Sequence, residues 1–268
     1  MKSKYTGLWI LLAVALAIFT LIAFMDDIPF FGTTIKKAPI AEKLTTPYKT
    51  TEEEAREKEE RKELALQEAA KPKEIPVDST PQNILVFGDS MSQNIALRLA
   101  AYAKQNGHTI HTVNWDSSGT RIWSKTDTLD HYIHLYQPTF IFVSLGGNES
   151  AAPNPDFFKP NVEKIRDKIG DIPFVWIGPP SLKEEHGFSD MLLTTLPPGT
   201  FFRSDGLTLE RRKDKIHPTK AAAALQIDSL VRWLRHSSSH PILMDIPADS
   251  IADTKISDTG IRYLKPVH

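Results

Sequence analysis

The sequence predicts an α/β domain, a three-layer sandwich with a mainly parallel central sheet, preceded by one N-terminal transmembrane helix. Two observations indicate the sandwich: short apolar runs alternate with helical stretches between residues 82 and 236, and the main runs lack the polar alternation of a half-exposed strand. Strands of this kind form parallel sheets that helices cover on both faces. A third observation, a stretch without charge near the start of the chain, predicts the transmembrane helix.

That stretch, GLWILLAVALAIFTLIAFM at 7–25, has nineteen residues. At about 1.5 Å per residue, a helix of this length just spans a hydrocarbon core of about 30 Å. Lys2 and Lys4 precede it, and basic residues favour the cytoplasmic side. Residues 1–36 are therefore expected to be a cytoplasmic tip and a single-pass anchor in the inner (cytoplasmic) membrane, with the rest of the chain periplasmic or extracytoplasmic. A cleaved signal peptide is the alternative, although the run is longer than usual for one.

Composition excludes several classes of function. The chain is 41% hydrophobic and 24% charged, as globular proteins are, and its formal net charge of -1 gives no electrostatic case for nucleic-acid binding. The absence of cysteine excludes disulfides, thiol chemistry and a lipid-modified cysteine. Residues 37–80, charged and punctuated by proline, predict a spacer. Residues 237–268 predict a C-terminal tail, in which GIRYL could add an edge strand.

Each element of the domain at 81–236 has its own sequence signal. NILVF predicts the first strand, and the helix after it covers 92–106, where Asn106-Gly107 is a favourable stop. The second and third strands are predicted from HTIHTVNW and TFIFVSLGG, of which the third is almost wholly apolar.

The second half of the domain continues the alternation. Pro153 and Pro155 introduce a helix predicted over 155–169, and PFVWIGPP predicts a fourth strand that its prolines stop. PTKAAAALQIDSLVRWLRH predicts the last helix, with Pro218 near its first turn. The insert Leu182–Lys213 has no pattern that predicts its structure.

Polar turns follow the strands at one edge of the predicted sheet. The Gly-Asp-Ser turn at 88–90 follows the first strand, Gly119 lies in the loop after the second, and Asn148 follows the third. Another polar cluster, DKIHPT, places Asp214 and His217 just before the last helix. Ligands of parallel sheets bind beyond the carboxyl ends of the strands, so these turns hold the candidate functional residues.

Ser90 alone has two interpretations. Ser and Asp are favoured at helix N-caps, and Ser90 with Gln93 has the spacing of a capping box. The same strand-to-helix turn could instead present Ser90 as a nucleophile.

The order of the polar blocks resembles that of the SGNH (GDSL-type) hydrolase family, whose four hallmark residues lie in separate blocks. The corresponding residues are Ser90 in FGDSMS, Gly119 in SSGTRI, Asn148 in LGGNE and His217 in DKIHP. The resemblance covers the domain and leaves the anchor, spacer and tail outside. It implies a flavodoxin-like sheet and serine hydrolase chemistry without a cofactor. One departure is Glu149, where the family usually has Asp.

The roles that the resemblance implies fit the residue types. A serine hydroxyl is a poor nucleophile until a base takes its proton, and His217 is the candidate base because imidazole titrates near neutral pH. Asp214 would orient the imidazole and stabilise the imidazolium. The backbone N–H groups of Ser90 and Gly119 and the side-chain amide of Asn148 form the expected oxyanion hole. The Gly-x-Ser-x-Gly elbow of α/β-hydrolases is absent.

Two other groups of side chains could have chemical roles. DTLDHYIH at 127–134 holds two histidines and two aspartates at helical spacing, but no further cluster completes a metal site. Trp115 and Trp123 flank the second polar block and could either stack on a sugar ring or pack in the core. No metal or other cofactor is therefore expected.

The expected function is that of a serine esterase that removes acyl groups from an extracytoplasmic glycan through an acyl-enzyme. The acyl group expected is acetyl. One alternative is an O-acyltransferase that moves acetyl groups onto an envelope or secreted polysaccharide, with a membrane acyl-transfer protein as its partner. Another is a catalytically idle glycan-binding or scaffold domain, against which the intact Ser90, Asp214 and His217 argue. That the substrate is a glycan is inferred from the resemblance and the expected location. No residue of the sequence shows glycan specificity by itself.

Overall fold

The computed structural model describes residues 5–24, 28–30, 33–35, 56, 75–180, 186–248 and 254–265. The chain divides into two compact units, Met1–Pro72 and Lys73–His268.

The first unit begins with helix α1 (Thr6–Phe24), and two short antiparallel strands follow, β1 (Ile28–Phe30) and β2 (Thr33–Ile35). Among the described residues, no helix combines the length and the apolarity that a membrane crossing requires. Most of the predicted spacer at 37–80 lies outside the described residues.

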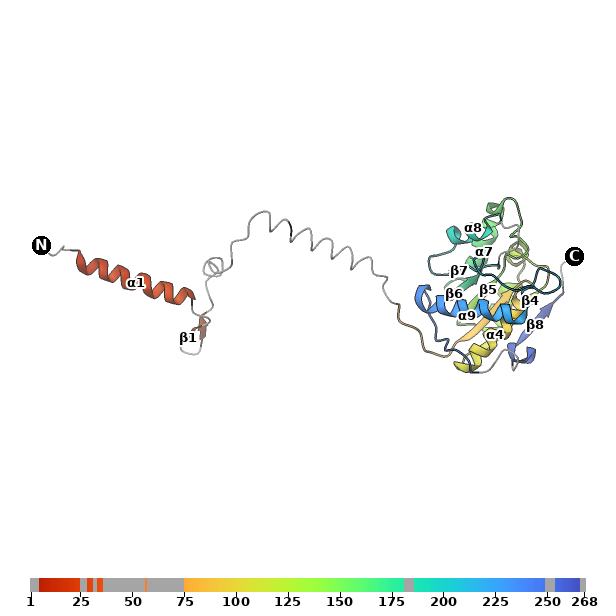
Figure 1. Ribbon diagram of the computed structural model, residues 1–268, viewed down its shortest axis with the longest axis horizontal. Coiled ribbons are helices and arrows are strands. Elements are labelled where there is room, and N and C mark those ends of the chain that lie inside the picture. The colour runs from red at the N-terminus through yellow and green to blue at the C-terminus, as the bar shows by residue number, and fades with distance from the viewer. Residues whose placement is uncertain are drawn as a thin grey trace. The chain divides into compact units, whose positions relative to one another are not determined.

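The second unit is built on a six-stranded sheet whose strands all run parallel, which confirms the predicted α/β class (Figure 1). From one edge to the other, the strands are β7 (Phe201–Phe202), β6 (Phe174–Ile177), β5 (Phe140–Ser144), β3 (Asn83–Gly88), β4 (Thr109–Trp115) and β8 (Ile261–Leu264). The four predicted strands are β3 to β6. Strands β3, β5 and β6 are largely apolar because both of their faces are covered, whereas β4 alternates polar and apolar residues.

Helices cover both faces of this sheet. One face is covered by α4 (Ser92–Gln105) and α9 (Lys220–Ser237), and the other by α5 (Thr120–Lys125), α6 (Thr128–Tyr136), α7 (Lys159–Ile169) and α8 (Phe188–Thr195). Successive side chains of β3 point to opposite faces: Ile84 and Val86 are buried with α4 and α9, whereas Leu85 and Phe87 are buried with the other helices. Burying one such side chain contributes about 1.5–3 kcal/mol.

The topological switch point of the sheet lies at β3. The chain passes from β3 to β4 on one side, and its next strand, β5, lies on the other side of β3. Such a switch leaves a crevice outside the carboxyl ends of the strands, where ligands bind. The turns after β3, β4 and β5 are the ones that hold Ser90, Gly119 and Asn148.

The C-terminal segment belongs to the folded unit. Ile242 and Met244 are 5% and 4% exposed and lie in the core cluster that includes α4 and α9. Asp78 forms a parallel bridge with Ile242, and β8 pairs with β4. The expected tail at 237–268 thus supplies an edge strand and core side chains, and the fold begins before residue 81.

Several elements differ from the sequence-based expectation. The helix expected over 155–169 consists of two parts: its first turn is a 3-10 helix, η1 (Pro155–Phe158), and the rest is α7 (Lys159–Ile169). Helices α5, α6 and α8, strand β7 and the 3-10 helix η3 (Ile256–Thr259) were not predicted, and α8 and β7 lie in the insert Leu182–Lys213.

Candidate active site

The turn after β3 is shaped by Asp89 rather than by Ser90. The Met91 N–H donates to Asp89 Oδ1 over 2.9 Å, and the Ser92 N–H donates to the Asp89 carbonyl over 3.0 Å. Helix α4 begins at Ser92, and its N-cap residue, Met91, has no side-chain capping bond. Ser90 therefore does not cap the helix, and its hydroxyl is available for another partner.

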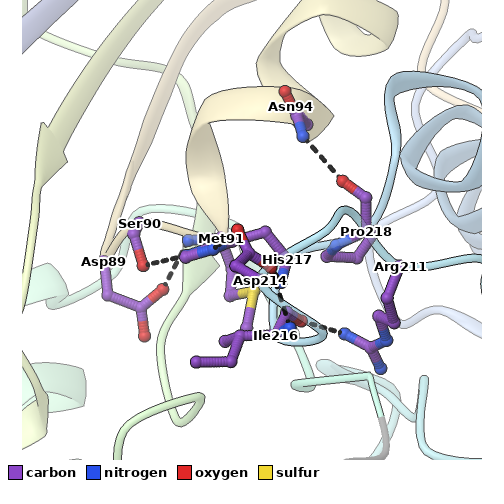
Figure 2. Close-up of polar contacts among 9 residues, drawn as sticks. All are labelled: Asp89, Ser90, Met91, Asn94, Arg211, Asp214, Ile216, His217 and Pro218. Carbon is purple, nitrogen blue, oxygen red and sulfur yellow. Dashed lines mark hydrogen bonds and ion pairs between the residues drawn. The ribbon is translucent and has the colours of Figure 1, made fainter.

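That partner is His217, from the loop before α9 (Figure 2). Ser90 Oγ lies 2.8 Å from His217 Nε2, and His217 Nδ1 lies 3.0 Å from Asp214 Oδ2. A carboxylate can only accept a hydrogen bond, so the Asp214 contact places the imidazole proton on Nδ1 and leaves the lone pair of Nε2 facing Ser90. This order of contacts is that of a nucleophile, a base and an orienting acid.

Asp214 is held in its ionised form. Its Oδ1 accepts the backbone N–H groups of His217 and Ile216 over 2.9 Å and 2.8 Å. These two bonds, with the bond from the His217 side chain, lower the pKa of Asp214 to about 2. The orienting carboxylate is therefore charged at every pH at which a histidine base is neutral.

The loop that carries His217 is fixed by the chain around it. Arg211 and Pro218 form an antiparallel bridge, and the Arg212 N–H donates to the His217 carbonyl over 2.8 Å. The buried Asn94 of α4 donates from Nδ2 to the Pro218 carbonyl over 2.8 Å, as Figure 2 shows. Because α4 starts two residues after Ser90, this bond ties the helix that follows Ser90 to the loop that carries His217.

The turns after β4 and β5 are joined to each other in two places. Asn148 Nδ2 donates to the Ser118 carbonyl over 2.7 Å, and that carbonyl belongs to the same peptide group as the Gly119 N–H. The next residue, Glu149, accepts the Thr120 N–H at its Oε1. Asn148 is thus bonded to the carbonyl side of the peptide group whose N–H, on the opposite side, belongs to Gly119.

Glu149 is a buried carboxyl that also requires glycine at position 119. A Cβ on Gly119 would lie 2.3 Å from Glu149 Oε1, well inside van der Waals contact. Glu149 is only 5% exposed, and its Oε2 has no hydrogen-bond partner among the described residues. Burial raises the pKa of this carboxyl.

A second buried carboxyl, Asp89, lies at the other side of the same corner. Burial raises the pKa of Asp89 to about 7, and the charge of Glu149 adds to the shift. The turn after β5 packs closely here, since a Cβ on Gly147 would lie 3.2 Å from Met91 Cγ and 3.3 Å from Asp89 Oδ2. The turns after β3, β4 and β5 therefore meet as one packed corner.

The structure brings the predicted site residues together in two groups. Ser90, His217 and Asp214 form one hydrogen-bonded chain, and Asn148 and Gly119 share the Ser118–Gly119 peptide group. No hydrogen bond among the described residues joins the two groups directly. The Asn148 side chain is exposed, and each amide nitrogen carries two hydrogens, so a second N–H can serve a ligand.

Trp123 is a core side chain and not an exposed surface for sugar stacking. It is fully buried, packs on Phe87 with ring centroids 4.8 Å apart, and donates from Nε1 to Ser118 Oγ over 2.9 Å. Trp115 is half-buried against the same core. In the segment 127–134, Asp130 forms an ion pair with Lys168. The described residues contain no group of three potential metal ligands.

Two positioning residues escaped the sequence analysis. Asn114, fully buried at the end of β4, donates from Nδ2 to the Asp89 carbonyl over 2.7 Å and to Ser92 Oγ over 2.9 Å. The sequence holds no clear signal for it, because Thr112 and Asn114 alternate with Val113 and Trp115 as the residues of a half-exposed strand do. Asn94 gave no signal either, since its partner lies in a loop far along the chain.

Comparison of the chain with models of protein families found no match, and comparison with proteins of curated function found none either.

Proposed function

We propose that this chain is a serine esterase of the SGNH (GDSL-type) class, which removes acetyl groups from a glycan outside the cytoplasm. The single observation that carries the proposal is the hydrogen-bonded chain from Ser90 Oγ through His217 to Asp214, with its distances of 2.8 Å and 3.0 Å. Its position at the carboxyl ends of the strands, next to the topological switch, supports the same conclusion.

The reaction has two steps. In the first, Ser90 Oγ attacks the ester carbonyl carbon while His217 Nε2 takes the hydroxyl proton, and the proton then passes to the departing sugar oxygen. This breaks the ester bond and leaves acetyl-Ser90 with a free sugar hydroxyl. In the second, water gives a proton to His217 Nε2 and attacks the acetyl carbonyl carbon. The bond between Ser90 Oγ and the acetyl group then breaks, His217 returns the proton to Ser90 Oγ, and acetic acid leaves and ionises to acetate.

The packed corner would supply the charge stabilisation. Negative charge develops on the carbonyl oxygen in both steps, and donors fixed beforehand stabilise it most. The N–H groups of Ser90 and Gly119 and the second amide hydrogen of Asn148 are the donors that we assign. Removing one such donor typically lowers kcat by about 100- to 1000-fold.

The location remains a prediction from the charge-free run at 7–25 and the lysines before it. A reporter fused after residue 40 should be active only outside the cytoplasm. Reporter activity in the cytoplasm would remove the argument for an envelope glycan as the substrate.

The test of the activity uses the purified full-length protein, a chromogenic acetyl ester and an acetylated polysaccharide. We expect the wild type and a matched Ser229→Ala variant, altered on the distant part of α9, to release acetate from both. Ser90→Ala should release none. Equal acetate release by Ser90→Ala would contradict the proposal.

A further inference from the structure

The loop that holds His217 is a short hairpin, residues 210–219. The Thr219 N–H donates to the Glu210 carbonyl over 2.9 Å, and inside that pair the Arg212 N–H donates to the His217 carbonyl over 2.8 Å. The turn is closed by the Lys215 N–H, which donates to the Arg212 carbonyl over 2.9 Å. These bonds fix the backbone, so each residue of the hairpin has a set place in the chain beside His217.

Three cationic side chains of this hairpin, Arg212, Lys213 and Lys215, form what we call the cationic rim. Lys213 and Lys215 are exposed, Arg212 is partly exposed, and none of the three forms an ion pair with any described residue. The chain as a whole has a formal net charge of -1. The positive charge of the rim is therefore local, because the protein as a whole is not basic.

The other charged groups of the hairpin are already engaged. Asp214 accepts two backbone N–H groups and the imidazole of His217. Glu210 accepts the hydroxyl of Thr219 over 3.2 Å. The guanidinium of Arg211 turns back to donate to the Ile216 carbonyl over 2.6 Å (Figure 2). The cationic rim is thus the part of the hairpin that is left for a ligand.

The backbone at Lys215 gives an independent indication. Its φ of 60° lies in the left-handed region, which glycine or asparagine adopts more easily than lysine. A residue held there costs of order 1–3 kcal/mol, and such strain gathers at functional sites. The turn between Asp214 and His217 therefore has a lysine where a smaller residue would be more stable.

We propose that the cationic rim binds an anionic polysaccharide, one whose sugars carry carboxylate, phosphate or sulfate groups, and so presents its acyl ester to Ser90. The residues of the cationic rim are exposed or partly exposed and not enclosed. One exposed ion pair contributes only about 0–1 kcal/mol, too little to hold a small anion. A polymer with a charge on successive sugars engages several cations at once, and its contacts add. The ester chemistry rests on the proposed function, whereas the binding does not.

The test measures binding and catalysis separately on the full-length protein. The probes are polygalacturonate as the anionic polymer and dextran as the neutral one. The test variant is R212E/K213E/K215E, with R212Q/K213Q/K215Q as a milder form if charge reversal impairs folding. The matched control K159E/K164E/R232E makes the same change of net charge on exposed positions of α7 and α9.

At an ionic strength of about 0.05 M, we expect the wild type and the control to bind polygalacturonate at least about tenfold more tightly than the rim variants. The difference should vanish near 0.5 M salt, where charges are screened within a few ångströms. Dextran should not distinguish the four proteins. Equal binding of polygalacturonate by the rim and control variants would overturn the proposal.

Two further outcomes separate the proposals from each other. Rim-dependent binding without ester cleavage would contradict the proposed esterase and leave the polysaccharide site in place. If acetylated polygalacturonate and acetylated dextran are cleaved with the same kcat/KM, the proposal that the cationic rim binds an anionic polysaccharide is wrong, whereas the proposed esterase activity stands. If the rim variants bind phosphatidylglycerol vesicles less tightly than the control while their polygalacturonate affinity is unchanged, the rim faces a membrane surface and the proposal is wrong.

Discussion

Replacing Gly119 by alanine tests whether the packed corner forms the proposed oxyanion hole. The backbone of Gly119 is extended, with φ of -151°, so alanine adds no backbone strain there. The added Cβ would lie 2.3 Å from Oε1 and 2.9 Å from Cδ of Glu149. Non-bonded heavy atoms are comfortable only at about 3.5–4.0 Å, so one side must move by about 1 Å.

The displacement should act mainly on the transition state. Moving the Glu149 carboxylate weakens its bond to the Thr120 N–H and shifts the Gly119 N–H beside it. Loss of one oxyanion donor costs about 2.7–4 kcal/mol of transition-state stabilisation, which is a fall in kcat of about 100- to 1000-fold. The ground state gains little from that donor, so KM should change much less. The weakened buried hydrogen bond should also lower the free energy of unfolding by about 1–3 kcal/mol.

The assay is steady-state hydrolysis of a chromogenic acetyl ester, with chemical denaturation to measure stability. Gly206→Ala is the matched control, because a Cβ there meets no atom within 4 Å. A kcat within about threefold of wild type for Gly119→Ala would refute the assignment of this N–H as an oxyanion donor.

Three other predictions concern the Ser90–His217 pair, the buried Asp89 and the acceptor of the acetyl group. Ser90→Ala and His217→Ala should each abolish nearly all ester cleavage, and the double variant should be little worse, because residues that act as a unit are not additive; additive losses would contradict the hydrogen-bonded pair. The pKa of Asp89 is about 7 in the folded protein, against an ordinary value of 3.8, so the folded protein holds a proton that the unfolded chain loses. The contribution of Asp89 to stability therefore falls as the pH rises from about 4 to about 7. Over that window the loss is of order 4 kcal/mol, and Asp89→Asn should flatten the pH dependence of the unfolding free energy measured in urea; an unchanged dependence would show that Asp89 does not titrate there. An isotopically labelled acetyl donor supplied with unacetylated glycan should give mainly labelled acetate, whereas labelled polysaccharide as the main product, lost in Ser90→Ala, would identify an acyltransferase.

The parts of the fold that could be predicted from the sequence are those governed by burial. Strands β3, β5 and β6 are covered on both faces, so nearly every residue is apolar and the runs stand out. Strand β4, TIHTVNW, is partly exposed and could be recognised only by its alternation of polar and apolar residues. Strand β8 could not be assigned with the same clarity, because Arg262 and Tyr263 are exposed on an edge strand. The short helices α5 and α6 were also missed, since their ends and packing depend on tertiary contacts more than on periodicity.

The candidate site shows the same division between local and distant signals. The polar blocks could be found because polar residues directly follow apolar strands, which is a local pattern. Whether Ser90 caps a helix or faces a base depends on His217, 127 positions further along the chain, and only the folded structure supplies that contact. The bond from Asn94 to Pro218 has the same character.

The proposed nucleophile can be tested directly by trapping Ser90 as an ester. The full-length protein would be treated with a fluorophosphonate, which reacts with activated serine hydroxyls, and its peptides analysed by mass spectrometry. We predict one phosphonylated serine, Ser90, no labelling in Ser90→Ala, and labelling of His217→Ala slowed by several orders of magnitude. Labelling at another serine, or labelling of Ser90 at the same rate in His217→Ala, would contradict the assignment of Ser90 and His217 as nucleophile and base.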